Sequence, residues 1–222
     1  MLACKQRLAL REDFASGTIM TIMHSLRWAG AIALATASFA RADPLTVVQV
    51  AAPDVNCVFD ASCKITVTDT TSEIPLNFTA GTPFLQSRTF SGAPGTPGAG
   101  LTGYEYRVDL TSAAGAVECL LGLVVNFGPV QLLPYKSGAK AHVYVVTQGG
   151  LGSIGIKSAE QDGDIVSFAF EKPLCVGVNP GAGPTTFFFG LASTKPPHAI
   201  SAGMWGFGTP AFLSLDARAP NH

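Results

Sequence analysis

The chain has 222 residues and a mass of 23.0 kDa, which suits one domain built around a single hydrophobic core. Hydrophobic residues make up 47% of it and charged residues only 13%, so the chain is too apolar to be disordered. The formal net charge is −1 and Lys and Arg do not cluster, which excludes the positive surface that nucleic-acid binding requires.

The first 42 residues are expected to be a leader. An uncharged, Ala-rich segment at 28–40 is followed by the small-x-small tripeptide 40–42, which predicts a secretory signal peptide over 20–42 with cleavage after Ala42. A membrane anchor is the alternative, but the apolar segment is shorter than the roughly 20 residues that cross a bilayer. Residues 1–19 precede a plausible translation start at Met20 and are not expected to belong to the fold.

Cleavage would leave residues 43–222 as the mature chain. It would remove five basic and two acidic side chains and leave a net charge of −4. No later apolar run has spanning length, so we expect no membrane span in the mature chain. We also expect no cofactor, because the one nucleotide-binding pattern, at residues 150–155, opens no helix. The expected location is secreted, periplasmic or at the cell surface.

Four cysteines follow the leader: Cys57, Cys63, Cys119 and Cys175. An even number in an oxidising compartment predicts two disulfides. Of the three pairings we favour Cys57–Cys63 and Cys119–Cys175, because residues 58–62 suit a short loop between two strand-like segments. A zinc site would need two close cysteine couples, and the sequence has one.

The best strand signal is the segment 104–110, in which apolar and charged residues alternate strictly. Its Tyr104 and Tyr106 are expected to face the core. The three charged residues are expected on the opposite, solvent-exposed face: Glu105, Arg107 and Asp109.

Shorter runs are also predicted to be strands: 45–50, 64–69, 74–78, 142–147, 165–170, 200–205 and 211–215. Residues 120–127 and 187–189 are apolar on both sides, which indicates central strands. No helix is predicted, and residues 158–161 are expected to form a turn. The Gly/Pro-rich segments 91–100 and 177–184 are expected to be mobile loops. We therefore predict an all-β fold, a single antiparallel β-sandwich of the Ig-like or jelly-roll-like kind over residues 43–222.

No catalytic motif is complete. Residues 150–155 match G-x-G-x-x-G but open no helix, and the surroundings of Ser153 lack the first glycine of a nucleophile elbow. Nothing in the spacing selects a pair among the histidines and the carboxylates, which are His142, His198, His222, Asp109, Asp162 and Asp164. The segment 162–164 supplies too few oxygens for calcium. The sequence therefore favours a protein without catalytic residues or a metal.

Aromatic side chains are the remaining candidates for ligand contact. Trp205 lies among small residues that leave room around its ring, and it is the first candidate binding residue. Tyr104 and Tyr106 share a strand face and could line a groove, although that face also fits the core.

Three segments, 104–110, 145–153 and 187–193, resemble uncharacterised exported bacterial β-domain proteins. The resemblance implies a secreted β-domain and no catalytic activity. Some of those proteins carry sorting tails. Residues 216–222 contain no apolar run or basic stop, so we do not expect anchoring by that route.

Three function classes follow. The first is a non-catalytic exported protein that binds a surface, a partner protein or a glycan. The second is a pilin-like assembly subunit, in which the alternating segment 45–50 would be the donated strand. The third is a secreted hydrolase or lyase on a jelly-roll scaffold.

Overall fold

The computed structural model describes residues 42–77, 79–115, 118–136, 139–207 and 212–221. These residues belong to the second of the two units into which the chain divides, Phe39–His222. Strands account for most of them, which confirms the all-β class. The predicted signal peptide, apart from Ala42, lies outside the described residues.

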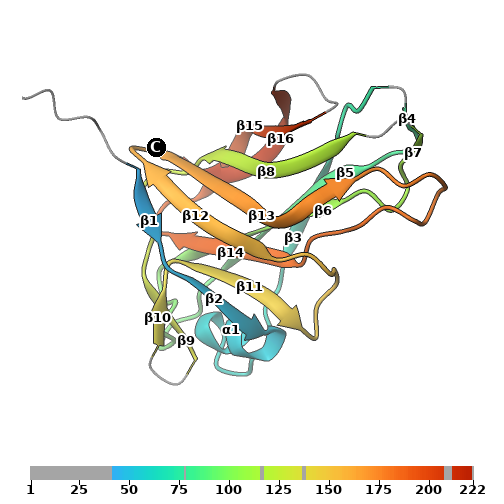
Figure 1. Ribbon diagram of the computed structural model, residues 1–222. Helices are drawn as coiled ribbons and strands as arrows, with labels where there is room; N and C mark the ends of the chain where they lie inside the picture. The colour runs from blue at the N-terminus through green and yellow to red at the C-terminus, as the bar shows by residue number, and fades with distance from the viewer. Residues whose placement is uncertain (1–41, 78, 116–117, 137–138, 208–211, 222) are drawn as a thin grey trace, which may run out of the picture. The chain divides into compact units, whose positions relative to one another are not determined.

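Two six-stranded sheets, which we name sheet A and sheet B, form two layers (Figure 1). Sheet A contains, in spatial order, β1 (Asp43–Leu45), β12 (Ile156–Asp162), β13 (Ile165–Cys175), β8 (Cys119–Asn126), β15 (Pro197–Phe207) and β16 (Leu213–Pro220). Sheet B contains β2 (Val47–Ala51), β11 (Val143–Gln148), β14 (Phe188–Ser193), β6 (Thr102–Asp109), β5 (Phe84–Ser91) and β3 (Thr68–Glu73). Two short pairs complete the list: β4 (Thr79–Ala80) with β7 (Ala114–Gly115), and β9 (Leu133–Lys136) with β10 (Ala139–Ala141).

The main core lies between the facing sides of the two sheets and takes side chains from both. Phe168 of sheet A and Phe189 of sheet B meet with their ring centroids 5.0 Å apart. Tyr106 packs against both of these rings. Burial of such large rings removes a large apolar area from water and stabilises the contact between the layers. The strict alternation in β6 therefore predicted its inward face correctly.

Strand pairing is antiparallel in both sheets except between β2 and β11, which are parallel. The expectation of purely antiparallel pairing is wrong for that pair. The parallel pairing arises because the N-terminal segment crosses between the layers. β1 pairs with β12 in sheet A, and β2 then joins the edge of sheet B beside β11. At the opposite edges, the Asp216 N–H donates to the Ser72 Oγ at 3.1 Å, so β16 and β3 also meet.

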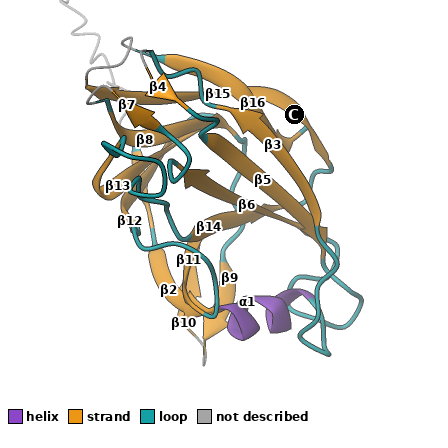
Figure 2. Cartoon of the chain, turned by 90° about the vertical axis from the view of Figure 1, so that its right-hand side faces the viewer, coloured by secondary structure: helices purple, strands orange, loops and turns teal. Residues whose placement is uncertain are grey.

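A helix that the sequence did not predict, α1 (Ala52–Phe59), follows β2 directly. Figure 2 shows it beside the strands of sheet B, where it contacts β2, β9 and β11. Pro53 and Asp54 in its first turn are helix-start signals, and Val55, Val58 and Phe59 supply the buried face. Residues 58 and 59, predicted to begin a short loop between two strand-like segments, instead form the last turn of α1. Two helical turns contain too few residues for a periodic pattern to indicate a helix.

Three further predictions of secondary structure need correction. Residues 64–67, predicted as the first part of a strand over 64–69, form no strand, and β3 begins only at Thr68. Ile65 and Val67 pack instead against the apolar cluster that contains the buried face of α1. Residues 158–161, predicted as a turn, lie within β12, and the turn comes later, at Gly163, whose φ is +57°. Residues 74–77, predicted as part of a strand, form none. Their backbone bonds locally instead, since the Leu76 N–H donates to the Ile74 carbonyl at 2.8 Å. Phe78, the last residue of that prediction, lies outside the described residues.

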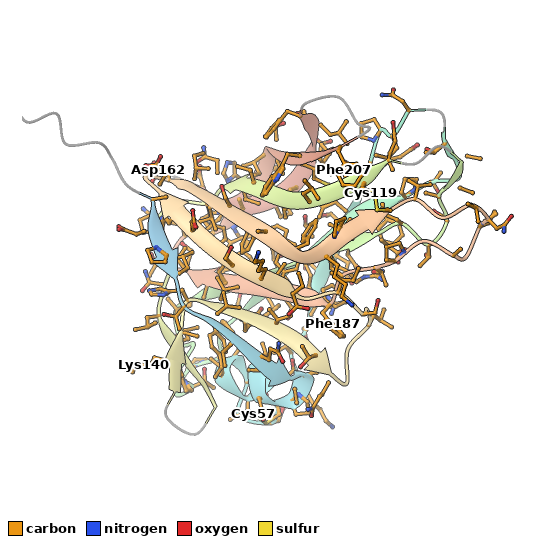
Figure 3. All side chains as sticks on the ribbon, in the orientation of Figure 1. Cys57, Cys119, Lys140, Asp162, Phe187 and Phe207 are labelled. Carbon is orange, nitrogen blue, oxygen red and sulfur yellow. A yellow bond between two sulfur atoms is a disulfide. The ribbon has the colours of Figure 1, made fainter. Side chains whose placement is uncertain are left out.

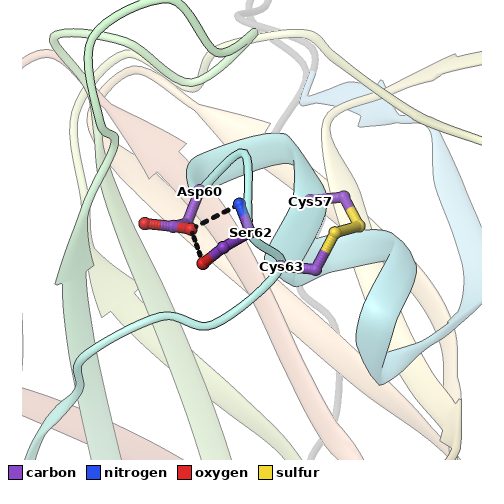
Figure 4. Close-up of a disulfide and its surroundings, with 4 residues drawn as sticks. All are labelled: Cys57, Asp60, Ser62 and Cys63. Atoms are coloured by element: carbon purple, nitrogen blue, oxygen red, sulfur yellow. Dashed lines mark hydrogen bonds between the residues drawn. A yellow bond between two sulfur atoms is a disulfide. The ribbon is translucent and has the colours of Figure 1, made fainter.

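Both predicted disulfides are present, Cys57–Cys63 and Cys119–Cys175. The first joins α1 to the turn that follows it, and Asp60 accepts a hydrogen bond from the Ser62 N–H at 2.8 Å within that turn (Figure 4). The second joins the paired strands β8 and β13. Figure 3 shows Cys57 and Cys119 well apart, so the bridges constrain different regions.

The first Gly/Pro-rich segment runs against the last turn of α1. The Ala93 N–H donates to the Phe59 carbonyl at 2.7 Å, and the Gly98 N–H donates to the Val58 carbonyl at 2.8 Å. The segment after β5 therefore satisfies carbonyl groups that the end of a helix leaves unpaired. It also holds α1 in place beside sheet B.

Candidate functional site

A cavity of about 430 Å³ lies on the outer face of sheet B. We name it the Glu105 pocket. Its walls come from α1, from the segment after α1, from β5, β6, β11 and β14, and from the loop after β11. The lining residues are Ala52, Val55, Asn56, Ile65, Val67, Arg88, Glu105, Val146, Gly149, Gly150, Leu151 and Phe188. The volume falls in the range of small-molecule sites, about 300–1,000 Å³.

Strand register brings the polar groups of this pocket into one row across sheet B. Asp69 of β3 pairs with Arg88 of β5, which pairs with Glu105 of β6. Glu105 pairs with Gly190 of β14, and Gly190 pairs with Tyr144 of β11. Side chains at paired positions project to the same face of a sheet, so this row is fixed by the backbone.

Gly190 makes the contact between Glu105 and Tyr144 possible. The Tyr144 hydroxyl reaches across the glycine and donates to Glu105 Oε1 at 3.2 Å. A Cβ on Gly190 would lie 2.6 Å from the Tyr144 oxygen and 2.2 Å from the Tyr104 carbonyl oxygen. The absence of a side chain at this position therefore shapes the site.

Replacement of Gly190 by Ala should destabilise the protein by about 1–3 kcal/mol, since the new methyl group has no space beside the Tyr104 carbonyl. Urea unfolding measures this cost. Tyr144→Phe is the matched control, because it removes the hydroxyl that bonds Glu105 without adding a clash. We expect the smaller loss, about 1 kcal/mol, for that control. A Gly190→Ala variant as stable as the wild type would contradict this role of the glycine.

Arg88 stands between two carboxylates. It donates from Nε and Nη2 to Asp69 at 2.9 and 3.2 Å, and its Nη1 lies 3.6 Å from Glu105 Oε2. The first pair has bidentate geometry, whereas the contact with Glu105 is longer than a hydrogen bond. Its guanidinium also lies over the Phe188 ring, 4.3 Å from the centroid. Asp69 is thus the main partner of Arg88, and Glu105 keeps one weakly paired oxygen.

Burial dominates the electrostatics of Glu105. The side chain is 5% exposed, and loss of water raises its pKa to about 7, although Arg88 and the Tyr144 hydroxyl oppose the shift. Burial likewise raises the pKa of Tyr144 and of Tyr135, whose ring centroids are 4.9 Å apart. By contrast, the hydrogen bond from Arg88 lowers the pKa of Asp69. Glu105 is therefore the group here that titrates near neutral pH.

The other charged residues of β6 are buried as well. Arg107 donates to Asp109 at 2.8 Å and to the Gln86 side chain at 3.0 Å, and Asp109 accepts from the Thr111 N–H at 2.9 Å. The expectation that Glu105, Arg107 and Asp109 face water is therefore wrong. These side chains do lie on the outer face of sheet B, but other elements cover it, including α1 over the Glu105 pocket.

The two predicted tyrosines are core residues. Tyr104 and Tyr106 are both fully buried. Their hydroxyls donate to the carbonyl groups of Lys195 and Arg218, at 2.8 and 2.7 Å. Neither tyrosine is among the lining residues of the Glu105 pocket. Neither pairs with Trp205, whose partner in register is Gly122.

Trp205 lies on the outer face of sheet A, where its ring covers Gly122 of the neighbouring strand. Phe207 is the last described residue before the gap at 208–211, and Phe212 is the first one after it. They are 50% and 56% exposed. Figure 3 labels Phe207 close to Cys119, its partner in register. The outer faces of the two sheets thus carry an aromatic surface and a polar pocket.

The other motifs do not assemble into a site. His142 Nδ1 accepts from the Thr46 N–H at 3.2 Å, and His198 Nδ1 contacts the Ala219 carbonyl at 3.1 Å. Asp162 and Asp164 flank the β12–β13 turn, and residues 150–155 lead into β12 without a helix. In the described part of the chain, no three His, Cys, Asp or Glu side chains gather as a metal site requires. His222 lies outside the described residues.

Comparisons with protein-family models and with curated proteins found no match to this chain. Within the described ranges, no helix is long and apolar enough to span a membrane. The two disulfides fit an extracellular protein. The Glu105 pocket is therefore the feature of this chain that bears most directly on its function.

Sequence reasoning missed the Glu105 pocket for a specific reason. Charged residues that alternate with apolar ones in a strand normally face water, and that rule assigned Glu105 to solvent. The sequence does contain one signal: Arg88, Glu105 and Asp69 would form a row of opposite charges if β3, β5 and β6 were neighbours. Strand order cannot be read from one sequence, so this signal becomes useful only with the fold.

Proposed function

We propose that this chain is an exported, non-catalytic glycan-binding protein. In this proposal residues 43–222 form a single β-sandwich, Ig-like or jelly-roll-like, after a cleaved signal peptide, and one sugar residue enters the Glu105 pocket. The location would be secreted, periplasmic or at the cell surface. The observation that carries the proposal is the buried Glu105 carboxylate, with one oxygen weakly paired, in the wall of a cavity of small-molecule size.

The chemistry of the walls supports a sugar. Sugars present hydroxyl groups beside apolar C–H surface, so they need polar groups next to aliphatic walls. The polar groups of the pocket come from Glu105, Arg88 and the Asn56 amide. Its aliphatic walls include Val67 and Val146. Asp69 and Glu105 hold Arg88 in place, which reduces the entropy lost when a ligand binds.

A hydrolase or lyase is the second candidate, because a pKa of about 7 suits Glu105 to general acid catalysis. Glycoside hydrolysis, however, usually needs two carboxyl groups at the reacting bond. The lining residues supply Glu105 alone, together with Arg88 as the other charged group. The pilin-like alternative is less well supported, since residues 43–51 already pair within their own chain, as β1 and β2.

Binding to a glycan array tests the proposal. We expect the wild-type chain to be retained on a subset of glycans and Val67→Phe, which fills part of the pocket, to lose at least about tenfold in affinity. Val178→Phe is the control, because residue 178 is exposed and is not part of the lining.

Three outcomes would contradict the proposal: no retention of the wild-type chain, equal retention of Val67→Phe, or release of shortened sugars from the retained glycan. Loss of binding in a Trp205→Ala variant, with Val67→Phe unaffected, would move the site to the outer face of sheet A.

A further inference from the structure

The Glu105 pocket has an excess of negative charge beside its cation. Asp69 neutralises Arg88 through two hydrogen bonds of 2.9 and 3.2 Å. Glu105 has no equally close cation, since its Oε2 lies 3.6 Å from Arg88 Nη1. The remaining lining side chains are neutral. When Glu105 is ionised, the local group Asp69, Arg88 and Glu105 therefore carries one net negative charge.

On this basis we propose that the ligand group held by the Glu105 pocket is a protonated primary amine, carried by a sugar residue whose amino group is unsubstituted. The inference rests on the proposed function and narrows its ligand class. The ammonium group would donate to Glu105 Oε2 and would make the charge-assisted hydrogen bond that Arg88, whose Nη1 is 3.6 Å away, does not make.

An anionic ligand fits the charges less well. Arg88 already lies between Asp69 and Glu105, so a bound anion would be the third negative group around one guanidinium. A neutral ligand would leave the buried Glu105 carboxylate without a close cation. The ammonium ion resolves both problems because it brings a positive charge and three donors.

The groups around Glu105 also predict that the protein releases a proton when an ammonium ligand binds. Arg88, Asp69, Tyr144 and Tyr135 are the titratable side chains that act on it, and burial raises the pKa of Glu105 to about 7. At pH 6 the free protein therefore holds a proton on Glu105. An ammonium ion favours the carboxylate, so its binding releases that proton.

Calorimetric titration with a matched pair of sugars tests the inference. The probes are a fully deacetylated and a fully N-acetylated glucosamine oligosaccharide of equal length, at pH 6 in two buffers with different ionisation enthalpies. We expect the deacetylated probe to bind at least about tenfold more tightly and to release up to one proton. Glu105→Gln should weaken its binding roughly 10- to 100-fold and abolish proton release. Glu160→Gln, at an exposed position on sheet A, should change neither.

The outcomes separate the two proposals. Equal affinity for the two oligosaccharides, proton uptake, or unchanged binding by Glu105→Gln would overturn the amine assignment. If Val67→Phe still abolished retention of another glycan, the proposed glycan-binding function would stand. Tight binding of n-butylamine with neither oligosaccharide bound would keep the ammonium chemistry and overturn the sugar as its source.

Discussion

Replacement of Glu105 by Gln should leave stability near that of the wild type at pH 4.5 and make the variant more stable at pH 8. The folded protein holds its Glu105 proton up to about pH 7, whereas the ordinary pKa of the group is 4.5. The contribution of protonated Glu105 to stability is therefore fully present below about pH 4.5, and it is lost as the pH rises through about 7. This pKa difference corresponds to about 3 kcal/mol across that interval.

Urea unfolding of both proteins at pH 4.5, 6 and 8 measures the effect. Glutamine keeps the shape and a hydrogen-bonding oxygen for Tyr144 but cannot ionise, so its curve should lack the fall seen in the wild type. Glu160→Gln, on the exposed side of β12, is the control and should follow the wild-type profile. If Glu105→Gln also followed that profile, Glu105 would not be buried as described.

Loss of the Cys119–Cys175 disulfide should cost about 4 kcal/mol, and loss of Cys57–Cys63 about 2 kcal/mol. The two bridges close loops with sequence separations of 56 and 6 residues, and a longer loop loses more entropy when it is closed. The paired variants Cys119→Ser/Cys175→Ser and Cys57→Ser/Cys63→Ser avoid free thiols. Thermal and urea unfolding without reductant measure both costs.

The two disulfide variants also serve as controls for each other. The larger cost should fall on the variant that loses the covalent link between β8 and β13, because those paired strands lie inside sheet A. Loss of Cys57–Cys63 should perturb the structure of α1 and of the neighbouring Glu105 pocket more than the structure of the main core. Equal costs, or the reverse order, would show that the loop-entropy argument does not govern this protein.

The all-β class and both disulfides could be predicted because their signals are local or few in number. The alternation of 104–110 needs only neighbouring residues, and the four cysteines of residues 43–222 allow only three pairings. The helix α1 could not be predicted in the same way, since two turns between a strand and a disulfide give little periodicity. Its start signals, Pro53 and Asp54, also occur in turns.

The candidate site depended on facts that a single sequence does not contain. Arg88 and Glu105 meet because β5 and β6 are neighbours, and Tyr144 reaches them because β14 places a glycine between. Each contact joins residues far apart in the chain. Only the inward face of β6 was predictable, and the outward face was assigned to water because nothing in the sequence indicates what covers it.

The crossing of the N-terminal segment between the layers has a consequence for the order of folding. During synthesis β1 and β2 emerge first, but their partners β12 and β11 begin only at Ile156 and Val143. Neither edge can be completed until most of the chain is available, and closure over so long a stretch is slow. Until then both segments expose unpaired backbone groups, and a chaperone or a second chain can occupy the vacant edges.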